Sequence, residues 1–210
     1  MKILIHAHEF NICEGGPCTK RMKSFAELFV KEGHEVIILT SSHNKFNEKK
    51  LNVNYKIVYS YSTKNIKGST VKRLVNNLLF GITSFFKALF SIGKVDVIIT
   101  TSPPPLISIF GYYIARVKRA KLIYDVRDIW PDVAIEMGSF GKDSIYFKVF
   151  IYISKFMYKK SDYITTVSPG KVKKIKKYCN VEKKVWYIPN GFDDNFTKFP
   201  EQKELVEKYK

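Results

Sequence analysis

Residues 124–132, YDVRDIWPD, place chemically active side chains directly behind an apolar run. The run KLIYDV at residues 121–126 predicts a buried strand, and Arg127 and Asp128 follow it at once. This base and acid either tie the loop together as a structural ion pair or present polar groups to a cleft. Trp130 is typical of a packed loop, and an indole also stacks on ligand faces. Which role applies depends on where the strand ends in the fold.

Strand-type and helix-type patterns alternate along the chain. Short apolar runs predict strands at residues 2–7, 34–40, 55–61, 96–100, 121–126, 162–167 and 185–189. Helical spacing of apolar residues predicts helices at residues 20–33, 71–92, 106–119, 141–160 and 168–179. This order predicts an α/β fold, a Rossmann-like three-layer sandwich with a central parallel sheet and right-handed crossovers. Residues 1–192 are expected to form this domain, and the polar residues 193–210 a linker that ends in a charged helix.

The carboxyl ends of parallel strands are where such folds bind ligands. Gly15 and Gly16 lie between the first strand and a helix, so backbone N–H groups there can approach an anion, although the pair also suits a flexible turn. The absence of G-x-G-x-x-G and Walker patterns argues against nicotinamide-dinucleotide and NTPase sites. Ser168 either caps the helix after the sixth strand or contacts a ligand, with Lys171 nearby. The prolines of TTSPPPL at residues 100–106 stiffen a strand-to-helix turn, and this structural role is sufficient to account for them.

The chain of 210 residues is strongly basic, since 36 Lys and Arg against 19 Asp and Glu give a formal net charge of +17. Such an excess indicates anionic partners, namely nucleic acid, lipid headgroups or phosphate-bearing small molecules, or simply a Lys-rich solvated surface. No known RNA- or DNA-binding motif is present, and the lysines are scattered. We therefore expect no specific nucleic-acid partner.

Cysteine and histidine spacing gives no pattern for a disulfide framework or a metal site. The three cysteines are an odd count, and no second Cys/His pair accompanies Cys13 and Cys18 to complete a zinc site. His6 and His8 are two residues apart and lack a carboxylate motif. We expect reduced thiols, no metal and no cofactor. The N-terminus does not have the features of a signal peptide, so the sequence predicts a cytoplasmic protein.

The predicted helix at residues 71–92 is apolar around most of its circumference. Asn76, Asn77 and Lys87 interrupt it, which argues against a transmembrane span. It is either a buried crossover helix or an amphipathic helix that lies on a membrane surface. With a charge of +17, the chain would be drawn to an anionic leaflet, and we predict peripheral association through this helix and nearby lysines.

Four motifs in a fixed order carry a family resemblance. They are MKILIHAHEF…EGG…R…F…L…GHEVIILT, then YDVRDIWPD, then YITTVSPGKVKKI, then VWYIPNGFD. Together they resemble the amino-terminal half of retaining GT-B glycosyltransferases of family 4, in particular the bacterial transferases of O-antigen and capsular sugars with their D-x-R-D-x-W-P hallmark. The resemblance runs from Met1 to about residue 193.

The resemblance implies one half of a GT-B fold, with the acceptor bound by this domain. The nucleotide-sugar donor binds mainly to a second domain carrying an E-x7-E pattern, which this sequence does not reach. Residues 193–210 would then be the linker and the start of the donor-binding half, and this part alone would be inactive. The implied reaction moves a hexose-type sugar from a nucleotide-diphosphate sugar to an acceptor hydroxyl, with retention and without a metal, in surface polysaccharide or glycolipid synthesis. A commonly lipid-linked acceptor agrees with peripheral membrane association.

The resemblance also implies roles for the residues at the strand ends. Related enzymes often place a His-Asp pair where this chain has Arg127 and Asp128, so a histidine role does not carry over. As the catalytic candidates, Asp128 would orient a sugar hydroxyl or the acceptor, while Arg127 would hold it or pair with phosphate. Alanine at Asp128 is expected to lower turnover sharply without unfolding the protein. The candidates for substrate binding are His8, Gly15, Gly16, Trp130, Glu136, Ser168 and Lys171.

Three readings remain open at this point. The chain is either part of a catalytic glycosyltransferase or a non-catalytic partner subunit that recruits a separate donor-binding chain. A sugar-nucleotide epimerase-like domain shares the Rossmann-like plan and is the third reading, although YDVRDIWPD resembles transferases.

Overall fold

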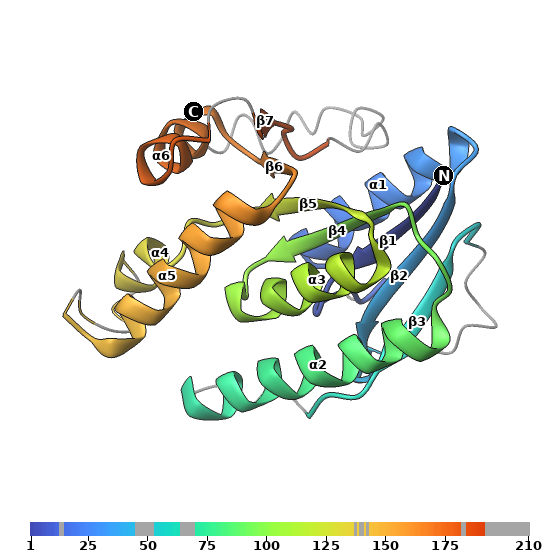
Figure 1. Ribbon diagram of the computed structural model, residues 1–210, viewed down its shortest axis with the longest axis horizontal. Coiled ribbons are helices and arrows are strands. Elements are labelled where there is room, and N and C mark those ends of the chain that lie inside the picture. Colours follow the sequence, from blue (N-terminus) through green and yellow to red (C-terminus); the bar gives the residue numbers. More distant parts are fainter. Residues whose placement is uncertain are drawn as a thin grey trace, which may run out of the picture.

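The described part of the chain forms one seven-stranded parallel sheet flanked by helices (Figure 1). The computed structural model describes residues 1–12, 15–44, 53–63, 70–136, 138, 141, 143–181 and 184–191. The strands lie in the order β3-β2-β1-β4-β5-β6-β7. They span β1 Lys2–His6, β2 Glu35–Ser41, β3 Lys56–Ser60, β4 Val97–Ser102, β5 Lys121–Val126, β6 Tyr163–Thr166 and β7 Val185–Tyr187. The helices are α1 Pro17–Lys31, η1 Ser42–Asn44, α2 Thr70–Ser91, α3 Pro105–Lys118, α4 Asp132–Glu136, α5 Ile145–Lys160 and α6 Pro169–Tyr178.

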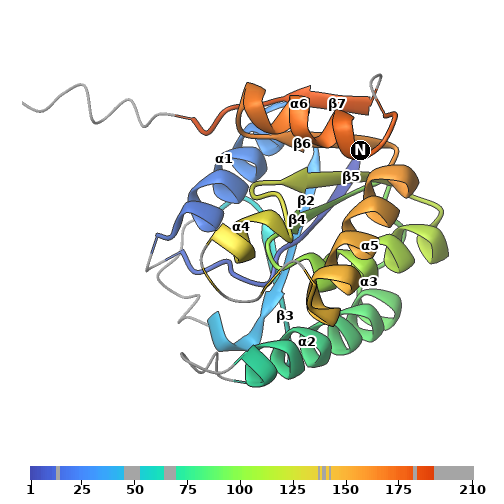
Figure 2. The ribbon, with the colours of Figure 1, turned by 90° about the vertical axis from the view of Figure 1, so that its left-hand side faces the viewer.

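The helices form two layers on opposite faces of the sheet (Figure 2). The chain moves one way along the sheet from β1 to β2 and the other way from β3 to β7, so right-handed crossovers place α1 opposite α2, α3, α5 and α6. Two apolar clusters follow from this. One packs α1 residues such as Met22 and Ala26 on the sheet, and the other packs α2, α3, α5 and α6 through Ala88, Ile114, Met157 and Ile175. The strands are therefore buried on both faces, which explains their continuous apolar runs.

The α/β class and the Rossmann-like sandwich around a parallel sheet are confirmed. Most element boundaries agree with the sequence to within three or four residues. The predicted helix at residues 141–160 begins at Ile145, because the Ser144 hydroxyl accepts a hydrogen bond from the Phe147 amide and caps the first turn. The five-residue helix α4 was not predicted, since DVAIE is too short to show helical periodicity.

Two sequence expectations fall on undescribed residues. The linker and charged helix at residues 193–210 lie outside the described part of the chain, and so does Cys13. The domain boundary at residue 192 therefore stays a prediction. The described cysteines, Cys18 and Cys179, are buried free thiols.

Gly111 sets how closely α3 approaches the sheet. A Cβ added to Gly111 would lie 2.5 Å from Thr100 Oγ1 and 2.6 Å from Thr100 Cβ, inside van der Waals contact. We expect Gly111→Ala to lower the free energy of unfolding by about 1–3 kcal/mol through overpacking. Gly170 in α6 has nothing within 4 Å of the same position, so Gly170→Ala should be neutral or slightly stabilising. Urea unfolding of both variants checks this, and equal midpoints would contradict the packing described.

Candidate functional site

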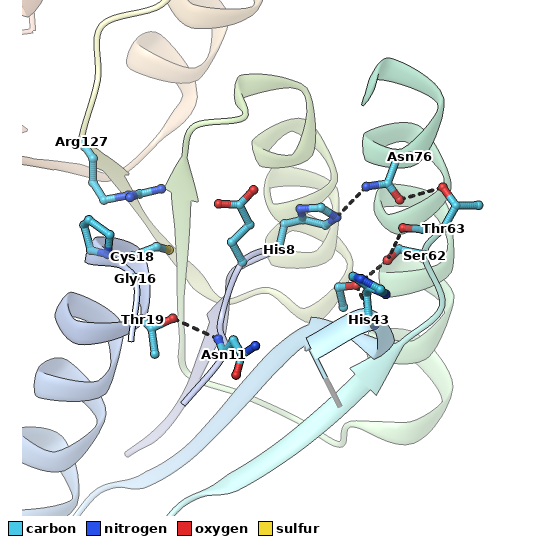
Figure 3. Close-up of a pocket in the computed structure, with 13 residues that line it drawn as sticks. His8, Asn11, Gly16, Cys18, Thr19, His43, Ser62, Thr63, Asn76 and Arg127 are labelled. Carbon is cyan, nitrogen blue, oxygen red and sulfur yellow. Dashed lines mark hydrogen bonds between the residues drawn. The ribbon is translucent and has the colours of Figure 1, made fainter. Parts of the chain in front are cut away.

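An open pocket of about 360 Å³ lies at the carboxyl ends of β1, β2 and β3, beside the start of α1 (Figure 3). Polar side chains from six parts of the chain face it. His8, Glu9 and Asn11 follow β1, while Ser62 and Thr63 follow β3. The remaining lining includes Gly16, Cys18, Thr19, Ser41, His43, Asn76 and Arg127.

The start of α1 and Arg127 form the electropositive side of this pocket. Gly16 is the N-cap of α1 and makes no side-chain cap, and Pro17 opens the helix. Arg127 donates from Nε to Thr101 Oγ1 at 3.1 Å and from Nη2 to the Pro103 carbonyl at 3.2 Å. These two bonds fix the guanidinium beside a helix N-terminus. Both groups favour an anion or an electron-rich oxygen at this side of the pocket.

The opposite side of the pocket is a hydrogen-bond chain from β1 to α2. Asn76 Nδ2 donates to His8 Nε2 at 3.3 Å, and Thr63 Oγ1 donates to Asn76 Oδ1 at 3.0 Å. Burial, with a smaller contribution from nearby His43, lowers the pKa of His8 to about 4. His8 is thus neutral near pH 7, and the pocket offers neutral donors and acceptors there.

His6 is a fully buried core residue of β1. Its Nε2 lies 2.9 Å from Ser84 Oγ and its Nδ1 lies 3.3 Å from Thr100 Oγ1. Its ring stacks on Phe80, whose ring also meets His8 edge to face. Complete burial, and secondarily the charge of His8, lower the pKa of His6 to about 3. The two histidines therefore join β1 to α2 as neutral rings.

This pair predicts loss of stability in mild acid. The pKa values of His6 and His8 in the folded chain lie below the ordinary histidine value of 6.5, so below pH 6.5 the unfolded chain binds protons that the folded chain does not. The contribution of the two neutral histidines to the free energy of unfolding should be fully present above that pH. It should fall by a few kcal/mol as the pH drops toward about 4. Urea midpoints measured at about pH 7.5 and about pH 5 test this. A His6→Gln variant should show a smaller difference, and a pH-independent midpoint in the parent chain would refute the assignment.

Asp128 and Lys171 form a second polar group outside the pocket lining. Lys171 Nζ lies 3.1 Å from Asp128 Oδ1 and also donates to the Arg127 carbonyl. The partner that holds Asp128 is therefore Lys171 rather than Arg127. Both side chains remain partly exposed, at 41% for Asp128 and 28% for Lys171. Ser168 caps α6 by accepting from the Lys171 amide at 3.4 Å, so the structural explanation accounts for its contacts.

The other predicted site residues lie at separate places. Trp130 packs edge to face on Phe150 of α5, with ring centroids 5.4 Å apart, which anchors the loop after β5. Glu136 is exposed at the end of α4. Gly15 has a positive φ of 62° and lines a neighbouring hollow with Arg21 and residues 190–191. Of the nine candidates, His8, Gly16 and Arg127 are the ones that share the pocket.

A buried ion pair beside the site was not predicted from the sequence. Arg21 of α1 and Asp125 of β5 are 2% and 0% exposed and approach to 2.8 Å. Thr101 and Thr165 also donate to the Asp125 carboxylate, at 3.3 and 2.7 Å. The signal was an acidic residue inside the otherwise apolar run KLIYDV.

Arg21 also fastens the chain that leaves the sheet after β7. Its Nη1 donates to the carbonyls of Ile188 and Pro189 at 3.0 and 3.1 Å, and to Asn190 Oδ1 at 3.2 Å. A single guanidinium therefore joins α1, β5 and the segment that follows the last strand. This ties the position of residues 188–190 to the sheet.

Comparison with known proteins identifies the family. The sequence profile described as Glycosyltransferase Family 4 matches residues 19–196, which is most of the chain. The chain belongs to glycosyltransferase family 4. No curated protein sequence matches it. Among the described residues, no three His, Cys, Asp or Glu side chains gather as a metal site.

Solved structures place this family 4 chain as half of a GT-B fold. HepE from Anabaena in complex with UDP is 13% identical with a TM-score of 0.61, and the match covers 100% of this chain and 50% of HepE. Sucrose-phosphate synthase from Thermosynechococcus elongatus is 12% identical with a TM-score of 0.68, over 100% and 52% of the two chains. The catalytic domain of starch synthase IV from Arabidopsis thaliana, bound to ADP and acarbose, is 14% identical with a TM-score of 0.61, over 92% and 52%. The chain thus spans about half the length of these structures.

Proposed function

We propose that this chain is the acceptor-binding half of a glycosyltransferase that moves a sugar from a nucleotide-diphosphate sugar to an acceptor hydroxyl in surface polysaccharide or glycolipid synthesis. The observation that carries the proposal is the pocket at the carboxyl ends of β1–β3, where Arg127 of the YDVRDIWPD motif meets the start of α1. Membership of family 4 supports the reaction class.

The pocket suits a sugar acceptor because it offers many neutral polar groups. The His8–Asn76–Thr63 chain and the Ser62 hydroxyl supply donors and acceptors of the kind that sugar hydroxyls need. Glu9 is exposed at the same pocket and adds an acceptor for a hydroxyl proton. In this proposal these groups align the attacking hydroxyl, which supplies positioning rather than covalent chemistry.

The electropositive side of the pocket suits the donor. HepE was crystallised with UDP and with UDP-glucose, which supports a nucleotide-sugar donor for this chain as well. Arg127 and the N-terminus of α1 would face the donor's diphosphate or transferred sugar across the cleft closed by a second half. Their fixed positive charge would stabilise the leaving diphosphate in a water-poor site.

We expect the chain alone to be inactive and a joined chain to transfer sugar. The experiment joins residues 1–191 to the donor-binding half of a family 4 glycosyltransferase and incubates the folded product with nucleotide-sugars and a membrane lipid extract. Release of nucleoside diphosphate that depends on the extract is the expected result, with each half alone as control. A folded joined protein that releases none with any nucleotide-sugar would count against the proposal.

A second candidate is a non-catalytic subunit of a split glycosyltransferase. This alternative predicts that a separate donor-binding chain co-purifies with this chain and that mixing the two chains restores sugar transfer. We prefer either transferase reading to a sugar-nucleotide epimerase-like domain, because the family match is to glycosyltransferases.

A further inference from the structure

The outward face of α2 carries a continuous apolar stripe. Six exposed residues recur at helical spacing over the length of the helix, and Phe90 is 78% exposed. A helix of a soluble domain normally presents such a stripe to the core. The stripe consists of Val71, Val75, Leu78, Ile82, Phe86 and Phe90.

The inward face of α2, by contrast, contains polar residues and residues with small side chains. Asn76 and Ser84 are buried there, where they bond His8 and His6, and Gly81 and Ala88 of the same helix are also buried. The buried side of α2 therefore includes polar side chains beside apolar ones such as Phe80. The six apolar side chains of the stripe are left on the surface, where they need a partner that the described residues do not supply.

The neighbouring helices extend the stripe into a broad surface. α3 packs beside α2 and α5 beside α3, so the three lie in a row on one side of the sheet (Figures 1 and 2). Tyr113 and Val117 of α3 are exposed, and Ile145 and Tyr152 of α5 are each 72% exposed. We call the outward surface of these helices the α2–α3–α5 face.

The charge of the α2–α3–α5 face has one sign. The three helices contain no Asp or Glu, although the whole chain has 19 acidic residues. Lys87, Arg116 and Lys155 are exposed on them and form no ion pair with any described residue. Apolar and tyrosine side chains with interspersed cations match the boundary between acyl chains and anionic headgroups.

We propose that the α2–α3–α5 face docks on an anionic phospholipid bilayer. By length and composition alone, residues Val71–Ser91 are also sufficient to cross a membrane. The inner side of α2, however, packs on α3, where a Cβ at Gly81 would lie 2.2 Å from the Phe110 ring, and it bonds β1. The helix therefore lies along the membrane plane as part of the domain.

The chemistry of the face disfavours other occupants. A symmetric dimer would place the same basic surface against itself, and like charges across such an interface repel. Nucleic acid would satisfy the cations and leave the Val, Leu and Ile side chains exposed to water. An anionic bilayer satisfies both kinds of side chain at once.

Docking would also bring the pocket close to the membrane. Asn76 lines the pocket from the inward side of the same helix whose outward side would contact lipid. If the proposed function holds, an acceptor anchored in the bilayer is within reach of that pocket. The docking proposal itself does not depend on sugar transfer, because lipid binding is measured without any substrate.

The test is flotation of the purified full chain with phosphatidylcholine vesicles that contain about 30% phosphatidylglycerol. The chain should float with these vesicles, and should float much less with pure phosphatidylcholine or at high salt. Phe86→Ser with Phe90→Ser should lower the partition coefficient by at least about tenfold, because two rings lose their contact with acyl chains. Lys87→Glu should lower it by about tenfold.

Matched controls are available on α1, on the other side of the sheet. Leu28 is 53% exposed and Lys31 is exposed, so Leu28→Ser and Lys31→Glu make the same kinds of change away from the face. Circular dichroism confirms that each variant is folded. Equal losses in the face and control variants, or no flotation of the parent chain, would overturn the proposal. A concentration-dependent dimer that the Phe86→Ser and Phe90→Ser changes abolish, without lipid binding, would assign the face to a second copy instead.

Discussion

Replacing Asp125 by Ala is expected to lower the free energy of unfolding by about 3–5 kcal/mol. The change leaves the guanidinium of Arg21, which is 2% exposed, without its carboxylate in the interior. It also removes the acceptor used by Thr101 and Thr165. Removing one partner leaves an unpaired charge in the interior, and this lowers the free energy of unfolding strongly. Replacing both partners by apolar residues of similar size changes the free energy of unfolding much less. Urea unfolding monitored by circular dichroism gives the change directly.

Two controls separate this effect from an ordinary loss of a side chain. Glu27→Ala removes the exposed α1 pair Lys23–Glu27 and should change stability by less than about 1 kcal/mol. The double change Arg21→Met and Asp125→Leu removes both buried charges and should recover much of the loss. An Asp125→Ala variant as stable as the parent chain would contradict the buried ion pair.

Replacing Arg127 by Ala in the joined enzyme is expected to lower kcat by about 10²–10³-fold. Thr101 and the Pro103 carbonyl hold this guanidinium at the pocket beside the N-terminus of α1, so its charge is in place before the reaction. Because the charge that it would stabilise develops on the leaving diphosphate, the loss should appear mainly in kcat. Release of nucleoside diphosphate under saturating substrate is the measurement.

The comparison set for Arg127 uses basic and acidic residues nearby. Lys173→Ala removes an exposed cation on α6 and should leave kcat unchanged. Asp128→Ala tests the predicted second catalytic candidate, and Lys171→Ala tests whether its ion-pair partner positions it. Arg127→Ala that retains the parent kcat would remove this residue from the active site.

The sequence predicted the fold well because a parallel sheet buried on both faces leaves an unmistakable pattern. Each strand reads as an apolar run, and the crossover helices fill the intervals between them. Ligands of parallel α/β sheets bind at the carboxyl ends of the strands, and this rule singled out His8, Gly16 and Arg127 as candidates. The three residues line one pocket in the structure.

The remaining features depend on contacts far apart in the chain. Arg21 and Asp125 are separated by 104 positions, and Asp128 and Lys171 by 43, so no local pattern pairs them. Asn76 appeared in the sequence as an interruption of an apolar helix, whereas it faces inward to His8 and the pocket. Contacts with His6 and His8 determine which side of α2 faces the sheet. The periodicity of apolar residues does not predict those contacts.

We propose that the pocket between α1, α2 and Arg127 binds the acceptor sugar. The most direct test of this proposal is amide chemical-shift mapping of the chain while methyl hexosides and glycosyl phosphates are added. We predict shifts centred on residues 8–11, Gly16, Ser62 and Asn76, and their loss in a folded Arg127→Ala variant for the phosphate-bearing probes. Shifts from sugar probes that lie only at other places, such as the ends of α4 and α5, would contradict the account.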